Sequence, residues 1–136
     1  MALANVTCVA IGGRGLLIEG PPGSGKSTLA LQLIDRGAAL VGDDGVSLDL
    51  RDGRLWAAPP PNIAGKLEIR GIGIVALPAA QAPVALVLSL GQSVPRLPEA
   101  GSTRWLGRTI PQLAFLAGDP ASAIRAEYAL THFGLG

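Results

Sequence analysis

One segment of eight residues constrains the fold and chemistry of this chain more than any other. Residues 20–27 read Gly-Pro-Pro-Gly-Ser-Gly-Lys-Ser, which is a complete phosphate-loop pattern, G-x-x-x-x-G-K-[ST]. The glycines let the backbone fold closely around an anion, so that successive N–H groups point at the phosphates. We expect Lys26 to reach the β- and γ-phosphates and the Ser27 hydroxyl to ligate Mg²⁺. The segment therefore predicts a binding site for a nucleoside triphosphate such as ATP.

The residues on both sides of the loop have the pattern that a phosphate loop requires. Residues 15–18 are an apolar run that predicts a buried strand, and residues 27–36 predict a helix that Gly37 ends. The apolar stripe of this helix comprises Leu29, Ala30, Leu33 and Ile34. The residues expected to bind the nucleotide are Gly20, Pro21, Pro22, Gly23, Ser24, Gly25, Lys26, Ser27 and Thr28. Because strand, loop and helix occur together, a chance glycine-rich turn is disfavoured.

Composition limits the class of protein. A chain of 136 residues is expected to form one domain, residues 1–136, with a core of useful size. Hydrophobic residues make up 49% and charged residues 15%, which favours self-association through a weakly polar surface. The net charge of +1 gives no electrostatic basis for binding nucleic acid or an anionic membrane.

The sequence also argues against a secreted or membrane-spanning chain. Residues 77–90 are the longest apolar region, and prolines and a glutamine interrupt it before it is long enough to cross a bilayer. The N-terminus lacks the basic segment and long apolar core of a signal peptide. The single cysteine, Cys8, excludes an internal disulfide, and its apolar setting in residues 6–11 predicts a buried structural thiol. These features favour the cytoplasm.

The rest of the chain predicts mostly strands. Expected strands cover residues 6–11, 39–41, 67–75 and 84–90, and residues 46–50 and 55–58 are expected to form a hairpin. Residues 58–62 read as a rigid connection and residues 91–101 as a loop. Asp119 and Pro120 are expected to open a helix that runs to about His132, before Gly134. This order lacks a regular βαβα alternation, so we predict an α/β fold with a mixed, largely antiparallel sheet.

Two adjacent carboxylates follow the strand at 39–41. In a phosphate-loop enzyme, an aspartate at the end of an apolar strand commonly completes the Mg²⁺ shell. Asp43 and Asp44 allow a division of roles, in which one stays near the metal and the other accepts a proton from an attacking hydroxyl. Asp-Asp-Gly is also ordinary turn chemistry. Next to a phosphate loop, the catalytic interpretation is favoured over the plain turn.

Residues 67–73 read Leu-Glu-Ile-Arg-Gly-Ile-Gly. Glu68 and Arg70 are two positions apart, so on one extended strand they would point to the same face. Their charges would suit Mg²⁺ and phosphate together. On its own, this pattern more simply indicates a surface ion pair.

Three segments together resemble one family, the HPr kinase/phosphorylases, bacterial enzymes that phosphorylate a serine of the phosphocarrier protein HPr. They are the phosphate loop, residues 33–44 (Leu-Ile-Asp-Arg-Gly-Ala-Ala-Leu-Val-Gly-Asp-Asp) and residues 67–73. The resemblance runs from about residue 6 to residue 73. It implies a fold related to phosphoenolpyruvate carboxykinase, a hexamer of catalytic domains and an HPr-type phosphocarrier protein as partner. The chain resembles the short form of the family, which lacks the separate N-terminal domain.

The resemblance also implies roles for single residues. The proton-transfer aspartate falls on Asp44 and the phosphate lysine on Lys26. The metal ligands fall on Ser27 and Glu68, with Asp43 nearby. A later catalytic arginine of the family falls on Arg96.

The positions at which this chain departs from the family are as informative as the positions at which it matches. The family carries a catalytic histidine where this chain has Asn5, and an amide cannot titrate. His132 is the single histidine, placed for a contact with the dipole at a helix C-terminus. The arginine-rich segment associated with dephosphorylation is replaced by residues 112–119, which hold no cation, and the C-terminal helices are reduced to one. We therefore expect the kinase direction to exceed phosphorolysis.

Two other classes stay open. A small-molecule kinase or general NTPase would share the phosphate loop but would add a lid with arginines, for which only Arg96, Arg104 and Arg108 are candidates. A nucleotide-sensing module would bind ATP and transfer nothing, an interpretation that Asn5 supports.

Overall fold

The structure, a computed structural model, describes residues 1–61 and 64–136. Its helices are α1 (Lys26–Asp35) and α2 (Ser122–Phe133). Its strands are β1 (Ala2–Ala4), β2 (Thr7–Ile11), β3 (Arg14–Glu19), β4 (Ala39–Gly42), β5 (Gly45–Arg51), β6 (Arg54–Ala58), β7 (Lys66–Ile69), β8 (Gly73–Ala76), β9 (Ala82–Ser89), β10 (Gly101–Trp105) and β11 (Arg108–Ala114).

Nine of the described strands form one curled sheet. Its main order is β1-β5-β6-β9-β3-β2-β4, and β11 joins β9 with β10 at its side. The pairs β3–β9 and β9–β11 are parallel, whereas the other pairs in the sheet are antiparallel. All eight residues of β9 are buried, as expected for a central strand that is covered on both faces. The predicted mixed, largely antiparallel sheet is confirmed.

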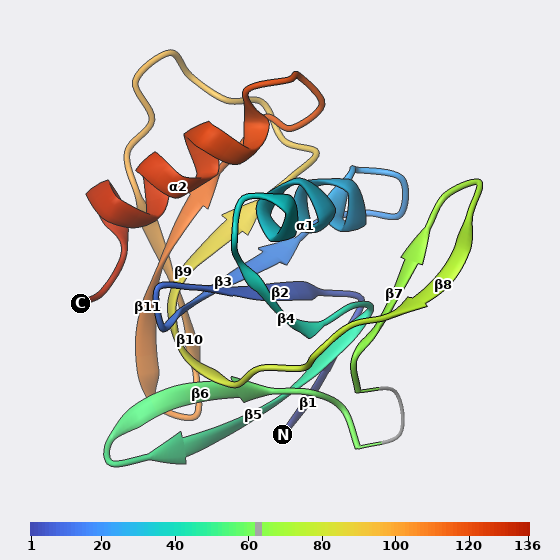
Figure 1. The fold of residues 1–136 in the computed structure, drawn as a ribbon. Helices are drawn as coiled ribbons and strands as arrows, with labels where there is room; N and C mark the ends of the chain where they lie inside the picture. Colours follow the sequence, from blue (N-terminus) through green and yellow to red (C-terminus); the bar gives the residue numbers. More distant parts are fainter. Residues whose placement is uncertain (62–63) are drawn as a thin grey trace.

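The two faces of the sheet carry separate apolar clusters. Successive side chains of a strand point to opposite faces, and β3 shows this directly. Leu16 and Ile18 pack with Leu33 and Leu130 beneath the two helices. Leu17 instead joins the cluster enclosed by the β5–β6 layer. Figure 1 shows this arrangement, with α1 and α2 above β3 and β9 and the β5–β6 hairpin below.

The predicted elements around the phosphate loop are confirmed. β3 is buried along its centre, and α1 buries Leu29, Ala30 and Leu33 against it. Arg36 is the C-cap of α1, and the Gly37 N–H donates to the Ile34 carbonyl. The hairpin expected around residues 51–54 is formed by β5 and β6.

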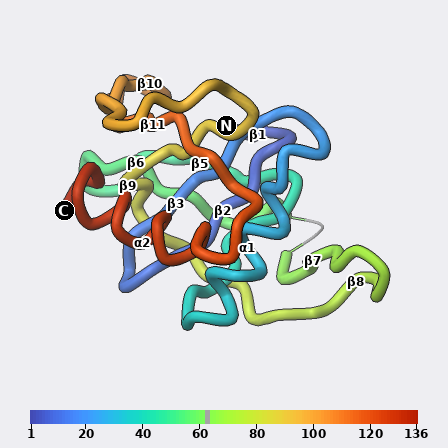
Figure 2. Tube along the Cα trace, turned by 90° about the horizontal axis from the view of Figure 1, so that it is seen from above, coloured from blue at the N-terminus to red at the C-terminus, as the bar shows by residue number. Residues whose placement is uncertain are grey.

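Residues 67–75 do not form a single strand, so that prediction was wrong. The chain reverses between β7 and β8 to make a two-stranded sheet of its own. Gly71 has φ 81°, a left-handed conformation that glycine adopts without strain, and this permits the reversal. The hairpin projects away from the main body beside α1 in both views (Figures 1 and 2).

The last third of the chain differs from the prediction in two places. Strands β10 and β11 were not predicted, because their alternation of polar and apolar residues is weak and is interrupted by Pro111. Asp119 is not the N-cap of α2, which begins at Ser122 with Ala121 as N-cap. Asp119 instead accepts the Ala121 N–H at 2.7 Å in the turn before the helix. The predicted helix end is confirmed, since Gly134 is the C-cap.

The predicted connection at residues 58–62 ends outside the described residues, at residue 62. Within residues 1–61 and 64–136, neither helix is long and apolar enough to cross a membrane.

Candidate functional site: a cleft beside the phosphate loop

The loop between β3 and α1 has the close backbone packing that its glycines predict. Gly20 has φ 155°, and a Cβ there would lie 2.7 Å from the Ser24 Oγ and 3.0 Å from the Leu90 carbonyl oxygen. A side chain at residue 20 would therefore force the loop to change shape. Gly25 is the N-cap of α1 and has no side chain to cap it. The first N–H groups of α1 are thus open to an anion.

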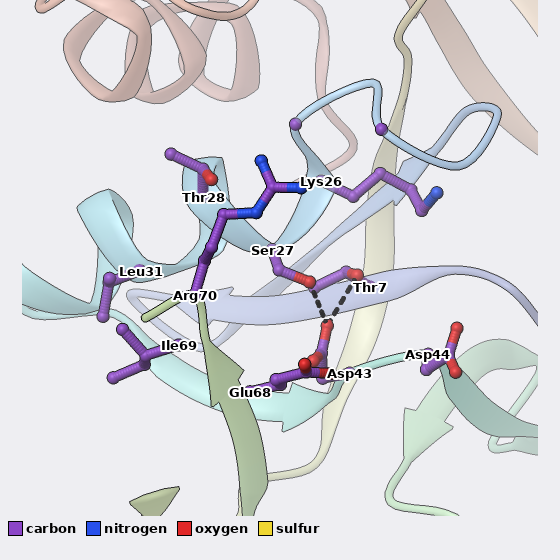
Figure 3. Close-up of a pocket in the computed structure, with 12 residues that line it drawn as sticks. Thr7, Lys26, Ser27, Thr28, Leu31, Asp43, Asp44, Glu68, Ile69 and Arg70 are labelled. Atoms are coloured by element: carbon purple, nitrogen blue, oxygen red, sulfur yellow. Dashed lines mark hydrogen bonds between the residues drawn. The ribbon is translucent and has the colours of Figure 1, made fainter. Parts of the chain in front are cut away.

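Lys26 closes the loop on itself. Its Nζ donates to the Gly20 carbonyl at 2.7 Å and to the Pro21 carbonyl at 3.3 Å. The ammonium group is thereby held at the start of the loop, and Figure 3 shows the Lys26 side chain extending along the loop. A positive charge in this place suits the terminal phosphates of a nucleotide.

Asp43 is fixed by two hydroxyl groups from different elements. The Ser27 Oγ donates to the Asp43 Oδ1 at 2.8 Å, and the Thr7 Oγ1 donates to the same oxygen at 3.1 Å (Figure 3). The antiparallel pairing of β2 with β4 brings Asp43 to this point, directly after β4. The half-buried carboxylate therefore lies against the serine of the phosphate loop.

Asp44 lies at the solvent side of the same cleft. It is exposed and has φ 65°, and its carbonyl accepts the Asn5 N–H at 3.1 Å. Asn5 is also exposed and has φ 62°. The two residues therefore adjoin through their main chains.

Residues from each of the three predicted segments line one cleft of about 490 Å³. Its walls comprise Thr7, Gly23, Gly25, Lys26, Ser27, Thr28, Leu31, Asp43, Asp44, Glu68, Ile69 and Arg70. The acidic groups come from the end of β4 and from β7, and the cationic groups come from α1 and from the turn after β7. Figure 3 shows the Arg70 side chain extending toward Thr28. Opposite charges thus line a single cavity beside the phosphate loop.

The donor set suits Mg²⁺ bound together with a nucleotide. Mg²⁺ prefers oxygen ligands and is usually held by one or two carboxylates, with phosphate oxygens and waters completing its shell. Ser27, Asp43 and Glu68 supply a hydroxyl and two carboxylates in the cleft. Within residues 1–61 and 64–136 there is no group of three or more His, Cys, Asp or Glu side chains that would hold a metal without such help.

Glu68 and Arg70 do not form the surface ion pair that their spacing indicated. Arg70 lies in the turn after β7, outside the strand. The ion pairs among the described residues are Arg36–Glu127, Arg51–Asp49 and Arg125–Asp119. Both side chains instead line the cleft.

Some candidate residues do not line the cleft. Four of them belong to the phosphate loop, Gly20, Pro21, Pro22 and Ser24, and three are arginines. Arg96 is exposed in the loop after β9, and Arg104 and Arg108 are exposed on β10 and β11. None of them is among the residues that line the cleft. The role of Arg96 stays a prediction from the resemblance.

Cys8 and His132 do not line the cleft. Cys8 is buried, as predicted, and burial raises the pKa of its thiol to about 12. His132 lies in the last turn of α2, and its ring packs edge-to-face on that of Phe133.

Sequence reasoning missed Thr7, Leu31 and Ile69 as residues of the cleft. A signal existed for Thr7, because it is the hydroxyl residue in the otherwise apolar run 6–11. The two apolar residues gave no chemical signal of this kind, since their side chains carry no polar group.

Comparisons with known proteins identify the class of the chain. The sequence profile of the family described as "HPr Serine kinase C-terminal domain" matches residues 2–81. This match covers more than half of the chain. The chain belongs to the HPr serine kinase C-terminal domain family, as its motifs predicted.

Individual relatives of the chain carry names from the same family. The chain is 49% identical over 67 residues to the HPr kinase/phosphorylase of Clostridium novyi (strain NT), and this match covers 49% of the chain and 22% of the relative. It is 48% identical over 68 residues to the protein of the same name from Streptococcus thermophilus (strain ATCC BAA-491 / LMD-9), with the same coverage. The matched segment thus spans about a fifth of these curated relatives.

The likeness in structure extends further than the likeness in sequence. The solved structure of the Hpr(Ser) kinase/phosphatase from Coxiella burnetii superposes with a TM-score of 0.82 at 28% identity. It covers 97% of this chain and 90% of that chain. The whole fold, including the strands and helix after residue 81, is therefore that of an HPr kinase structure.

Proposed function

We propose that this chain binds Mg·ATP and transfers the γ-phosphoryl group to a serine of an HPr-type phosphocarrier protein. The observation that carries the proposal is the bond between the Ser27 hydroxyl and the Asp43 carboxylate at 2.8 Å, in a cleft that also holds Asp44 and Glu68. This hydrogen bond links the phosphate loop to a carboxylate in a cavity that holds two further carboxylates. The names of the relatives support the choice of acceptor.

The loop binds and orients the triphosphate. The open N–H groups at the start of α1 and the Lys26 ammonium group favour negative charge at the same place. In the free loop, the ammonium group is bonded to the Gly20 and Pro21 carbonyls. An ammonium group has three N–H donors, so one donor remains for a phosphate oxygen while these two bonds are kept.

Ser27, Glu68 and Asp43 are the residues that would hold the metal. Bound Mg²⁺ supplies neutralisation of the charge on the phosphate oxygens. The side chains of Asp43 and Ser27 are already in contact, so little rearrangement is needed to present both.

Asp44 is the proposed general base. The serine hydroxyl gives its proton to the Asp44 carboxylate while its oxygen forms a bond to the γ-phosphorus. The bond from that phosphorus to the bridging oxygen breaks, and ADP leaves with the electron pair. Asp44 is exposed at the mouth of the cleft, where a hydroxyl group carried by another protein has access. Arg96 is proposed to assist through the resemblance alone.

One observation favours a second candidate, an ATP-binding module with weak or no transfer. Asn5 occupies the place of the family histidine and adjoins Asp44, with its N–H 3.1 Å from the Asp44 carbonyl. An amide in this position cannot take up or release a proton. For the same reason we propose that phosphorolysis is slower than the kinase reaction.

We also propose that the chain self-associates in the cytoplasm, as a hexamer if it follows the resemblance. The β7–β8 hairpin exposes Ile72 and Ile74 to 77% and 72%. Large apolar side chains exposed to this extent on one hairpin favour burial against another surface. Light scattering of the wild type and of a double variant with lysine at both positions tests this part of the proposal.

A panel of acceptors tests the function. The pure chain with Mg·ATP is offered an HPr-type phosphocarrier protein, free sugars, nucleotides and carboxylic acids in parallel, and ADP release is measured. The proposal predicts release that depends on the phosphocarrier protein. Release with a small molecule would identify a small-molecule kinase, and ATP binding without release would identify the binding module.

A further inference from the structure

The Thr7 hydroxyl makes a contact that the strand itself does not require. Thr7 is 1% exposed and is the first residue of β2, between apolar neighbours. A hydroxyl group buried in this way has to find a hydrogen-bond partner. Threonine in a strand can use a nearby main-chain carbonyl. Thr7 instead donates to a charged side chain, the Asp43 carboxylate, at 3.1 Å.

The partner of Thr7 is the group that meets the phosphate loop. The same oxygen, Asp43 Oδ1, accepts the Ser27 hydroxyl at 2.8 Å. The carboxylate is therefore held through one oxygen by a residue of α1 and a residue of β2. The pairing of β2 with β4 shifts register between Cys8 and Val9, next to Thr7. This irregularity in the strand pairing lies next to the hydrogen bond from the Thr7 hydroxyl to Asp43.

The entry of β2 contacts both acidic residues. Asn5 donates its N–H to the Asp44 carbonyl, and Thr7 donates its hydroxyl to the Asp43 side chain. The two residues are separated by one position, so one short segment holds the main chain of one aspartate and the carboxylate of the other. Of these contacts, the one from Thr7 acts on a carboxylate that lines the cleft.

We propose that Thr7 is a positioning residue, which orients the Asp43 carboxylate for the Mg²⁺ that accompanies a bound nucleotide. The proposal rests on the metal-binding part of the proposed function. A hydrogen bond from a neighbouring side chain restricts the rotation of a ligand and fixes its direction, and loss of such a partner typically lowers metal affinity about 10- to 100-fold. A hydroxyl with a purely structural role would lower stability without this selective effect.

Nucleotide binding with and without the metal separates the two roles. ADP is titrated calorimetrically into the wild type, Thr7→Val and Thr7→Ser, once with Mg²⁺ and once with EDTA. Thr7→Val keeps the shape of the side chain and removes the hydroxyl, and Thr7→Ser keeps the hydroxyl. We expect Thr7→Val to bind ADP about tenfold more weakly with Mg²⁺ and equally well with EDTA. Thr7→Ser is expected to bind as the wild type does.

Ser89→Ala is the matched control. Ser89 is 4% exposed and donates its hydroxyl to a carboxylate, Glu19, at 2.9 Å, but it does not line the cleft. Its loss is expected to lower the melting temperature without changing the ratio of ADP affinities with and without Mg²⁺. Equal ratios for Thr7→Val and wild type would overturn the proposal, as would an equal loss of affinity in both conditions.

Two further measurements test the role of Thr7 if the first variant does not fold or if its effect has another cause. If Thr7→Val does not fold, Thr7→Ala is titrated in its place, with the same expected loss. In an Asp43→Asn background the threonine substitution is expected to have no further effect on the Mg²⁺ dependence, and an undiminished effect there would contradict the proposal. If the ADP affinity of the wild type is the same with Mg²⁺ and with EDTA, the metal site of the proposed function is refuted. That result differs from one in which only the Thr7 variants behave like the wild type.

Discussion

The main-chain N–H of Asn5 donates a hydrogen bond to the carbonyl of Asp44 at 3.1 Å, and both residues have positive φ angles, 62° and 65°. The place where the family resemblance expects a histidine therefore adjoins the proposed general base. Asparagine and aspartate tolerate this backbone conformation better than most residues do. The neighbourhood of Asp44 is thus defined by backbone geometry as well as by charge.

Asp44→Asn is expected to bind ATP as tightly as the wild type and to lose phosphoryl transfer by about two orders of magnitude or more. The amide keeps the shape and the backbone preference of the residue but cannot accept the proton. ATP affinity by calorimetry and initial rates of phosphocarrier phosphorylation measure the two quantities. Asp52→Asn is the matched control, since Asp52 has φ 51° in a turn and does not line the cleft. Unchanged turnover in Asp44→Asn would assign Asp44 to turn formation alone.

Lys26→Met is expected to weaken ATP binding by about tenfold to a hundredfold. The substitution removes a charged donor to phosphate, a contribution of about 1.5–3 kcal/mol. It also leaves the Gly20 and Pro21 carbonyls without the ammonium group that now bonds them. Lys66→Met changes the other lysine of the chain, which is exposed on β7, and should leave affinity unchanged. Equal ATP affinity in Lys26→Met and wild type would argue against a phosphate site at the loop.

Asn5→His is expected to raise the rate of phosphoryl transfer and to add a pH dependence between about pH 5 and 8, where histidine titrates. The new imidazole would be carried by the residue whose main-chain N–H bonds the Asp44 carbonyl. Rates are measured across this pH range for the wild type, Asn5→His and Asn5→Gln, the last of which adds length without a titratable group. A flat profile at the wild-type rate would favour the ATP-binding module over a weakened enzyme.

The buried thiol predicts how stability responds to alkaline pH. Burial raises the pKa of Cys8 to about 12 from 9.0, so the unfolded state releases its proton first as pH rises. The contribution of the protonated Cys8 thiol to the free energy of unfolding is complete below pH 9. It is lost between pH 9 and 12, by about 1.4 kcal/mol per pH unit. Urea denaturation of the wild type and Cys8→Ala at pH 8, 9, 10 and 11 should show this difference in slope. Parallel pH profiles would contradict it.

The sequence predicts the local parts of the site well. The phosphate loop, the helix after it and the acidic pair depend on residues that are close in the chain, so spacing and turn chemistry suffice. Gly37 and the turn at residues 51–54 were predicted for the same reason. The family resemblance then joined Glu68 to the loop across a long stretch of sequence, and the structure brings both to one cleft.

Non-local pairing accounts for what the sequence did not predict. The β7–β8 reversal depends on a glycine inside a run that otherwise reads as one strand, and β11 is defined by its parallel pairing with β9. The role proposed for Thr7 depends on the register between β2 and β4, which no single segment encodes.

Phosphorylation-site mapping decides whether this chain phosphorylates a serine of an HPr-type phosphocarrier protein. An HPr-type phosphocarrier protein is incubated with Mg·ATP and either the wild type or Asp44→Asn, and peptide mass spectrometry locates any phosphoryl group. We predict one phosphoserine with the wild type and at most a trace with the variant. A phosphocarrier protein that stays unmodified with the wild type, or is modified equally by both chains, would contradict it.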